Sequence, residues 1–284
     1  WSASDIAQAI FDLQGKHKLK GIILDLRYNT GGLLPQAIDV SSLFLKQGII
    51  VSTKDYTGHI RHNRNTLSKP IWDGPLIILT NRASASASEI VAQALQDYGR
   101  AIIIGEGETY GKGSVQKCSV FMNYNNKPSS KGEYKVTSEM FYTVSGKSPQ
   151  LTGVISDITL PGYLSEAKIG EKHATFPLPS ASIDPNYVDT LTDLPPRKRE
   201  KIRDYYYEHS QKQMTSYTEL LEILQKNAEH RLENNDDYQA FIEYLQEGSY
   251  DKKETFGQND LQLKETMNVM KDLIILLEQQ EKSP

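Results

Sequence analysis

The chain has 284 residues, 38% of them hydrophobic and 24% charged, and its formal net charge at pH 7 is −4. This length suits one large domain or two, and the apolar fraction is enough for a buried core. No run of about 18 apolar residues is present that could span a bilayer, and no basic face of the kind that nucleic acid requires can be recognised. The composition therefore excludes a transmembrane helix within these residues and gives no support to nucleic-acid binding.

The first part of the chain places an apolar strand before a glycine-rich turn. A helical pattern over residues 6–13 is followed by the continuous apolar run 21–26, which predicts a buried strand. Residues 27–32 are typical of a turn, and a helix is expected over about 34–46. Backbone amides in such a turn can point outward at an anion or an oxyanion, but an ordinary strand-to-helix turn explains the same residues equally well.

The next segment combines a short strand with a polar stretch. Residues 49–54 predict a strand, and residues 56–73 are expected to form a polar loop. His59 and His62 lie in this loop, but no third ligand follows at a spacing typical of metal sites. Neither a metal site nor a cofactor is predicted.

Two further apolar runs, 75–80 and 101–104, flank a helical segment that ends near Tyr98. A strand, a helix and a strand joined by short links predict a right-handed parallel crossover. In open parallel sheets, functional sites lie beyond the carboxyl ends of the strands. The start of this helix is therefore a candidate site.

Two motifs lie at the ends of that crossover. Residues 83–90 read Ala-Ser-Ala-Ser-Ala-Ser-Glu-Ile, and residues 110–116 read Tyr-Gly-Lys-Gly-Ser-Val-Gln. Ser86 and Glu89 fit the capping box of an ordinary helix, and the Gly-Lys-Gly-Ser step lacks the glycine spacing of a phosphate-binding loop. A serine hydroxyl and a neutral lysine amine are nevertheless a workable nucleophile and base.

Together the two motifs closely resemble those of the C-terminal processing peptidases, also called tail-specific proteases. The resemblance implies that Ser86 is the nucleophile, that Lys112 is the general base, and that Gln116 orients the lysine amine. The turn before the lysine is one residue longer than is usual in the family, at residues 107–108. A lysine amine is an effective base only when neutral, so an apolar pocket is expected around Lys112.

A second family signature is similar to residues 24–32, Leu-Asp-Leu-Arg-Tyr-Asn-Thr-Gly-Gly. The resemblance implies that the backbone amides of Gly31 or Gly32 and of Ala87 form the oxyanion hole. Asp97 matches a residue that counts as important in some relatives. A carboxylate beside the lysine would favour the ammonium form, so a structural role is favoured for Asp97.

The remaining chain predicts a long strand over 133–144, a linker-like stretch from about 169, and then helices. The fold class expected is mixed α/β, with a parallel-sheet βαβ protease core, added strands and a mainly helical C-terminal domain. The expected domains are a peptidase core at 1–165 and a linker with helical domain at 166–284. The helices are expected at 197–213, 216–232, 236–246 and 260–281.

The function implied by the resemblance is that of a serine endopeptidase with a Ser86/Lys112 dyad, which acts through an acyl-enzyme on polypeptides with nonpolar C-terminal tails. The family also implies a PDZ domain in the full precursor and a periplasmic location. Two other classes stay open on the same core: a lipid-binding module without proteolysis, and a regulatory scaffold.

Overall fold

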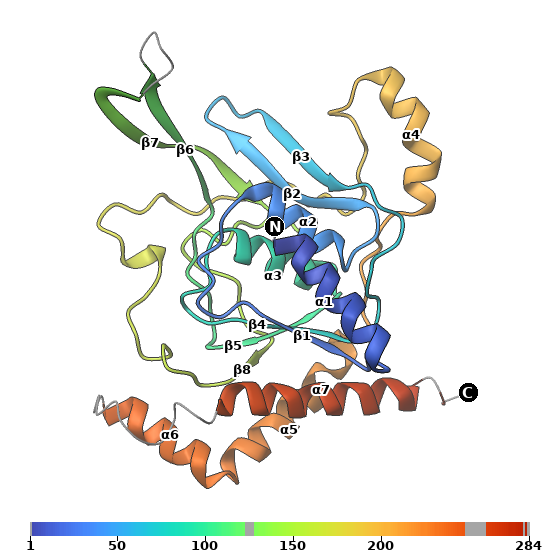
Figure 1. The fold of residues 1–284 in the computed structure, drawn as a ribbon, viewed down its shortest axis with the longest axis vertical. Helices are drawn as coiled ribbons and strands as arrows, with labels where there is room; N and C mark the ends of the chain where they lie inside the picture. The colour runs from blue at the N-terminus through green and yellow to red at the C-terminus, as the bar shows by residue number, and fades with distance from the viewer. Residues whose placement is uncertain (1, 123–127, 248–259, 281, 283–284) are drawn as a thin grey trace.

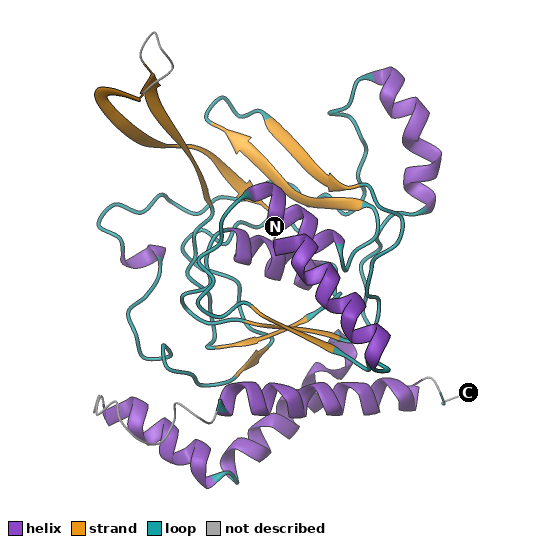
Figure 2. Ribbon diagram, viewed as in Figure 1, coloured by secondary structure: helices purple, strands orange, loops and turns teal. Residues whose placement is uncertain are grey.

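The computed structural model describes residues 2–122, 128–247, 260–280 and 282. Within these residues the chain forms a parallel sheet and an antiparallel sheet, each of four strands, with helices around them (Figures 1 and 2). This arrangement confirms the mixed α/β fold class. None of the helices in the described part is both long and apolar enough to cross a membrane.

The parallel sheet has the strand order β1-β4-β5-β8, and each neighbouring pair is parallel. Helix α3 connects β4 to β5, so the predicted crossover is confirmed. The carboxyl ends of β1, β4 and β5 meet at one edge, which is where the two motifs begin. The bounds of these elements are β1 Ile22–Asp25, β4 Leu76–Leu79, α3 Ala87–Asp97, β5 Ile102–Gly105 and β8 Ile158–Thr159.

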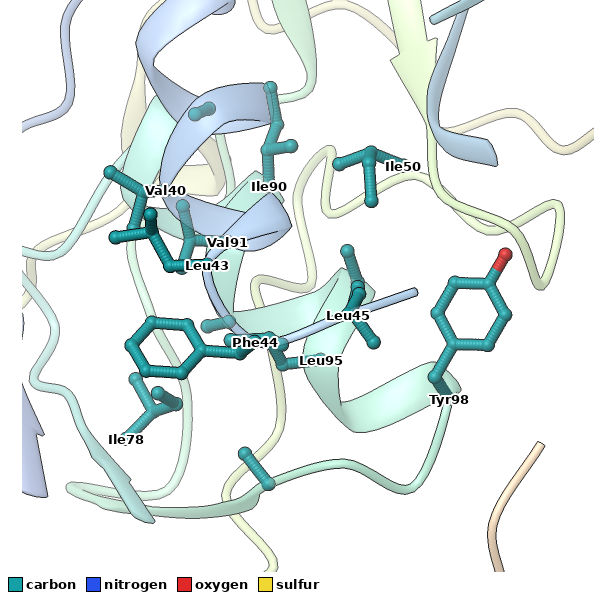
Figure 3. Packing of buried hydrophobic residues seen from close by; sticks show 14 of the residues in the cluster. Val40, Leu43, Phe44, Leu45, Ile50, Ile78, Ile90, Val91, Leu95 and Tyr98 are labelled. Atoms are coloured by element: carbon teal, nitrogen blue, oxygen red, sulfur yellow. The ribbon is translucent and has the colours of Figure 1, made fainter. Parts of the chain in front are cut away.

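One face of the parallel sheet is covered by the N-terminal helices (Figure 1). These are α1 (Ser2–Lys16), α2 (Leu34–Ser42) and α3. Alternate strand residues, such as Ile78, pack there against side chains of α2 and α3 in a dense apolar core (Figure 3). Because the strands are buried on both faces, their sequences are continuous apolar runs rather than alternating ones.

The opposite face of the same sheet is covered by α5 and α7, which lie below it in Figure 1. Ile77 and Ile104 pack there against Leu224 and Val269. The C-terminal helices therefore share a core with the sheet, and the domain boundary at residue 165 stays a prediction. The helical elements of this part are η1 Glu171–His173, α4 Pro196–Glu208, η2 Thr218–Leu220, α5 Leu221–Glu233, α6 Asp236–Glu247 and α7 Leu261–Gln280.

The antiparallel sheet has the strand order β3-β2-β7-β6, and β6 with β7 forms the long hairpin at the upper left of Figure 1. The prediction of a polar loop over 56–73 was wrong, because β3 lies within it. This edge strand reads Ile-Arg-His-Asn-Arg-Asn, too polar to be recognised, and pairing with β2 holds it in place. The bounds are β2 Gly48–Asp55, β3 Ile60–Asn65, β6 Ser114–Met122 and β7 Pro128–Tyr142.

Candidate active site

Ser86 lies in the sharp turn between β4 and α3. Its φ is 57° and its ψ is −111°, a backbone conformation that costs a non-glycine residue free energy and that clusters at functional sites. The Ser86 amide donates to Glu89 Oε2 at 2.7 Å, so the capping-box glutamate holds the turn from inside the helix. A strained strand-to-helix turn of this kind presents a serine hydroxyl at the sheet edge.

Asn29 joins the glycine-rich turn after β1 to this serine turn. Its carbonyl oxygen accepts hydrogen bonds from the Ala85 amide at 3.0 Å and from Ser88 Oγ at 2.9 Å. The two turns follow neighbouring parallel strands, so they leave the sheet at the same edge. Backbone groups from residues far apart in the sequence are thereby brought beside Ser86.

The three amides considered for an oxyanion hole have different surroundings. The Gly31 amide donates to Asn29 Oδ1 at 3.0 Å. Gly32 and Ala87 line the same pocket as Ser86, and among the described residues no hydrogen-bond acceptor lies on either amide. Gly32 and Ala87 are therefore the amides that are available to a bound group.

Lys112 lies in the loop between β5 and β6, with its side chain half-buried. The neighbouring Gly111 has a φ of +89°, which favours glycine. The Lys112 amide donates to Glu89 Oε2 at 2.9 Å. In the described part of the chain no hydrogen bond joins Lys112 Nζ to Ser86 Oγ, although both side chains line one pocket. Catalytic hydrogen bonds often form only when substrate binds.

The pocket has a volume of about 340 Å³ and brings together residues from both motifs and from the antiparallel sheet. Gln116, which the resemblance assigned to orienting the lysine, lies on its wall together with Lys112. Much of the remaining wall is apolar, and a second lysine, Lys135, also lies on it. The apolar side chains are Leu33, Leu34, Ala87, Ile90, Val115 and Phe141.

Asp97 lies at the opposite end of α3 from Ser86. Eleven helical residues correspond to about 16 Å, so the side chains of Ser86 and Asp97 lie in different parts of the structure. Asp97 Oδ2 accepts hydrogen bonds from Thr143 Oγ1 and from the Ser145 amide, and burial raises the pKa of this carboxyl group. It lines a separate cavity of about 890 Å³ that contains neither Ser86 nor Lys112.

Glu89 is the residue of this site whose wider role the sequence did not reveal. Its side chain is fully buried, and burial raises its pKa to about 7. Besides Ser86 and Lys112, its carboxyl group binds the Thr109 hydroxyl and the Gly111 amide. The capping-box spacing pointed to Glu89, but only to its bond with Ser86.

The turn before the lysine, in which the resemblance predicts one extra residue, is held by ion pairs from two sides. Gly107 has a φ of +96°, and Glu108 forms ion pairs with Arg82 at 3.0 Å and with Lys172.

As for metal ions, the described residues contain no group of three or more His, Cys, Asp or Glu side chains that could hold one.

Residues 1–160 match the family described as peptidase family S41. The chain belongs to peptidase family S41. The family expected from the two motifs is thus confirmed. The matched residues include all four strands of the parallel sheet and both motifs.

Named relatives agree with this assignment. The S41 chain is 37% identical over 200 residues to the tail-specific protease of Haemophilus influenzae, covering 67% of this chain and 28% of that protein. It is 44% identical over 170 residues to the carboxy-terminal-processing protease of Bartonella bacilliformis, covering 57% and 37%. The matches therefore span less than half the length of these relatives.

Among solved structures, the S41 chain is similar to one titled photosystem II D1 C-terminal processing protease. The identity is 32% and the TM-score is 0.48, covering 56% of this chain and 39% of that one.

Proposed function

We propose that this chain carries the catalytic core of a serine endopeptidase of the C-terminal processing type. In this proposal Ser86 is the nucleophile, Lys112 is the general base and Gln116 orients the lysine amine. The observation that carries it is the shared pocket, where Ser86 and Lys112 lie with the backbone amides of Gly32 and Ala87, neither of which has an acceptor among the residues that the structure describes.

The proposed reaction proceeds in two halves. Lys112 Nζ takes the proton of Ser86 Oγ as this oxygen bonds to the carbonyl carbon of the peptide. The amides of Gly32 and Ala87 donate to the oxyanion, while Gly31 shapes the turn. The lysine returns its proton to the leaving amine as the peptide bond breaks. Water, activated by the same lysine, then hydrolyses the acyl-enzyme and frees Ser86.

The proposed substrates are polypeptides with nonpolar C-terminal tails. Two features support this: the apolar wall made by Leu34, Ile90 and Phe141 beside the serine, and the names of the relatives, which refer to tails and carboxyl termini. The family further implies a PDZ domain in the precursor, which we propose as the tail-binding module, and a periplasmic location.

The test is cleavage of a protein that carries a nonpolar C-terminal tail. Ser86→Ala and Lys112→Ala should each abolish cleavage, because each removes a group on which the proposed reaction depends. Lys147→Ala is a suitable control, since this exposed lysine lies at the cavity around Asp97. Circular dichroism and thermal unfolding should show that all three variants keep the fold.

A covalent probe for active serines gives an independent readout. It should label Ser86 in the wild type and not in Ser86→Ala. Normal turnover by purified Ser86→Ala or Lys112→Ala would contradict the proposal. A folded wild type that neither cleaves nor reacts with the probe would favour the lipid-binding or regulatory alternatives.

A further inference from the structure

The carboxyl group of Glu89 links the turn that carries Ser86 to the turn that carries Lys112. Its Oε2 accepts hydrogen bonds from the Ser86 amide at 2.7 Å and the Lys112 amide at 2.9 Å. Its Oε1 accepts from the Gly111 amide at 2.6 Å and the Thr109 hydroxyl at 2.5 Å. A single oxygen atom, Oε2, therefore binds the backbones of both proposed catalytic residues.

These bonds go beyond what a helix cap requires. A capping box accounts for the bond between Glu89 and the Ser86 amide. The other three bonds reach across from α3 to the segment after β5, at sequence separations of 20 to 23 residues. Such long-range bonds fix two separate loops relative to each other, not one helix end.

An ionised carboxyl group satisfies all four donors of this network at once. A backbone N–H can only donate, and the Thr109 hydroxyl, which accepts from the Val154 amide at 2.8 Å, can donate its proton to Glu89. A carboxylate has about four acceptor sites, and four donors occupy them here. The side chain is fully buried, so no solvent competes for these charge-assisted bonds.

We propose that Glu89 is a positioning residue of the active site, whose carboxylate fixes the backbone of Ser86 relative to that of Lys112. This inference rests on the proposed peptidase function. In the Glu89→Gln variant an amide NH₂ replaces one oxygen and faces two donors, so two of the four bonds are lost. A displacement of about 1 Å between reacting groups is enough to cost on the order of 10²-fold in rate.

The experiment compares Glu89→Gln with a matched control in the 284-residue chain. We expect kcat for the tail-bearing substrate to fall on the order of 10²-fold, with KM changed less than about three-fold, because the pocket walls are intact. The control is Glu106→Gln. Glu106 is also buried and accepts from two backbone amides, Arg82 at 3.1 Å and Leu164 at 2.9 Å, but it bonds neither Ser86 nor Lys112.

The two variants separate positioning from general destabilisation. Both are expected to lower the free energy of unfolding, and only Glu89→Gln is expected to lower kcat. Wild-type kcat in Glu89→Gln, or an equal loss of kcat in Glu106→Gln, would overturn the inference.

A spectroscopic readout keeps the inference separate from the proposed function. In a pH titration followed by ¹H–¹⁵N NMR, the amide protons of Ser86 and Lys112 should shift together in the wild type and not in Glu89→Gln. Failure of the wild type to cleave would overturn the proposed function only. Independent behaviour of the two amides would overturn the inference, whether or not the chain is active.

Discussion

A Cβ atom on Gly31 would lie 2.6 Å from the backbone nitrogen of Ala87 and 2.5 Å from the carbonyl oxygen of Ala85. Gly31 also has a φ of +90°, in the region that favours glycine. The turn after β1 therefore packs backbone against backbone on the turn that carries Ser86. This close approach lets Gly32 and Ala87 line one pocket.

We expect Gly31→Ala to be strongly destabilising. The added methyl group meets two backbone atoms that cannot move aside cheaply, and the φ angle adds strain, so the free energy of unfolding should fall by roughly 2 kcal/mol or more. Gly32→Ala is the control, because a Cβ there has no neighbour within 4 Å. Urea denaturation of both variants checks this, and equal losses would show that the contact at Gly31 is not tight.

The stability of the wild type should depend on pH through Glu89. Burial raises the pKa of Glu89 to about 7, above the ordinary value of 4.5. The folded chain thus holds a proton between pH 4.5 and 7 that the unfolded chain releases. The stabilisation that comes from the raised pKa of Glu89 is fully present below pH 4.5 and is lost as the pH rises through 7.

The measurement is the difference in free energy of unfolding between the wild type and Glu89→Gln. On going from pH 8 to pH 5, the free energy of unfolding of the wild type should rise relative to that of Glu89→Gln by roughly 2 to 3 kcal/mol. Burial also raises the pKa of other carboxyl groups, such as those of Asp97 and Asp157. Their effects on stability are the same in both proteins and cancel in the difference. Cleavage should follow the opposite trend, because the ionised carboxylate holds the loops. A difference that does not change with pH would argue against a titrating Glu89.

Asp97→Ala should affect stability more than chemistry. The variant leaves the Thr143 hydroxyl and the Ser145 amide without their acceptor, which should cost about 1 to 3 kcal/mol of unfolding free energy. The active-serine probe should still label Ser86, because Asp97 lies at the far end of α3. Loss of labelling at unchanged stability would instead assign Asp97 to the catalytic machinery.

The ion pair between Arg27 and Asp260 should anchor the start of α7 to the end of β1. Two nitrogens of Arg27 donate to the two oxygens of Asp260, at 2.6 and 3.0 Å. Asp260→Asn removes the charge, and because the aspartate side chain is 43% exposed, the loss should be no more than about 1 kcal/mol. Amide exchange should become faster in the first turn of α7.

Glu278→Gln serves as the control for this helix. It removes the partner of Lys20 near the other end of α7, where both side chains are about half exposed, 55% and 48%. We expect no measurable change in unfolding free energy, because both charges are solvated. Equal effects of the two variants would mean that the pair at Arg27 is no stronger than an ordinary surface pair.

Much of the fold was predictable because its strands are buried. The runs around Ile78 and Ile103 are apolar on both faces, and that pattern identifies parallel strands without knowledge of their partners. The edge strand β3 was missed for the opposite reason. Its residues are polar and only partly covered, so pairing with β2, not composition, makes them a strand.

The sequence by itself determined the family and the parallel crossover, and it predicted Ser86 and Lys112 as the catalytic pair, because these depend on short motifs and on local apolar runs. The tertiary structure decided which groups meet. Within the described part of the chain, it binds the Gly31 amide to Asn29 and gives the Gly32 amide no acceptor. It also turns Glu89 from a helix cap into a bridge to Lys112. Such contacts depend on which strands lie side by side and on how completely a carboxyl group is removed from water, and neither quantity is written in the local sequence.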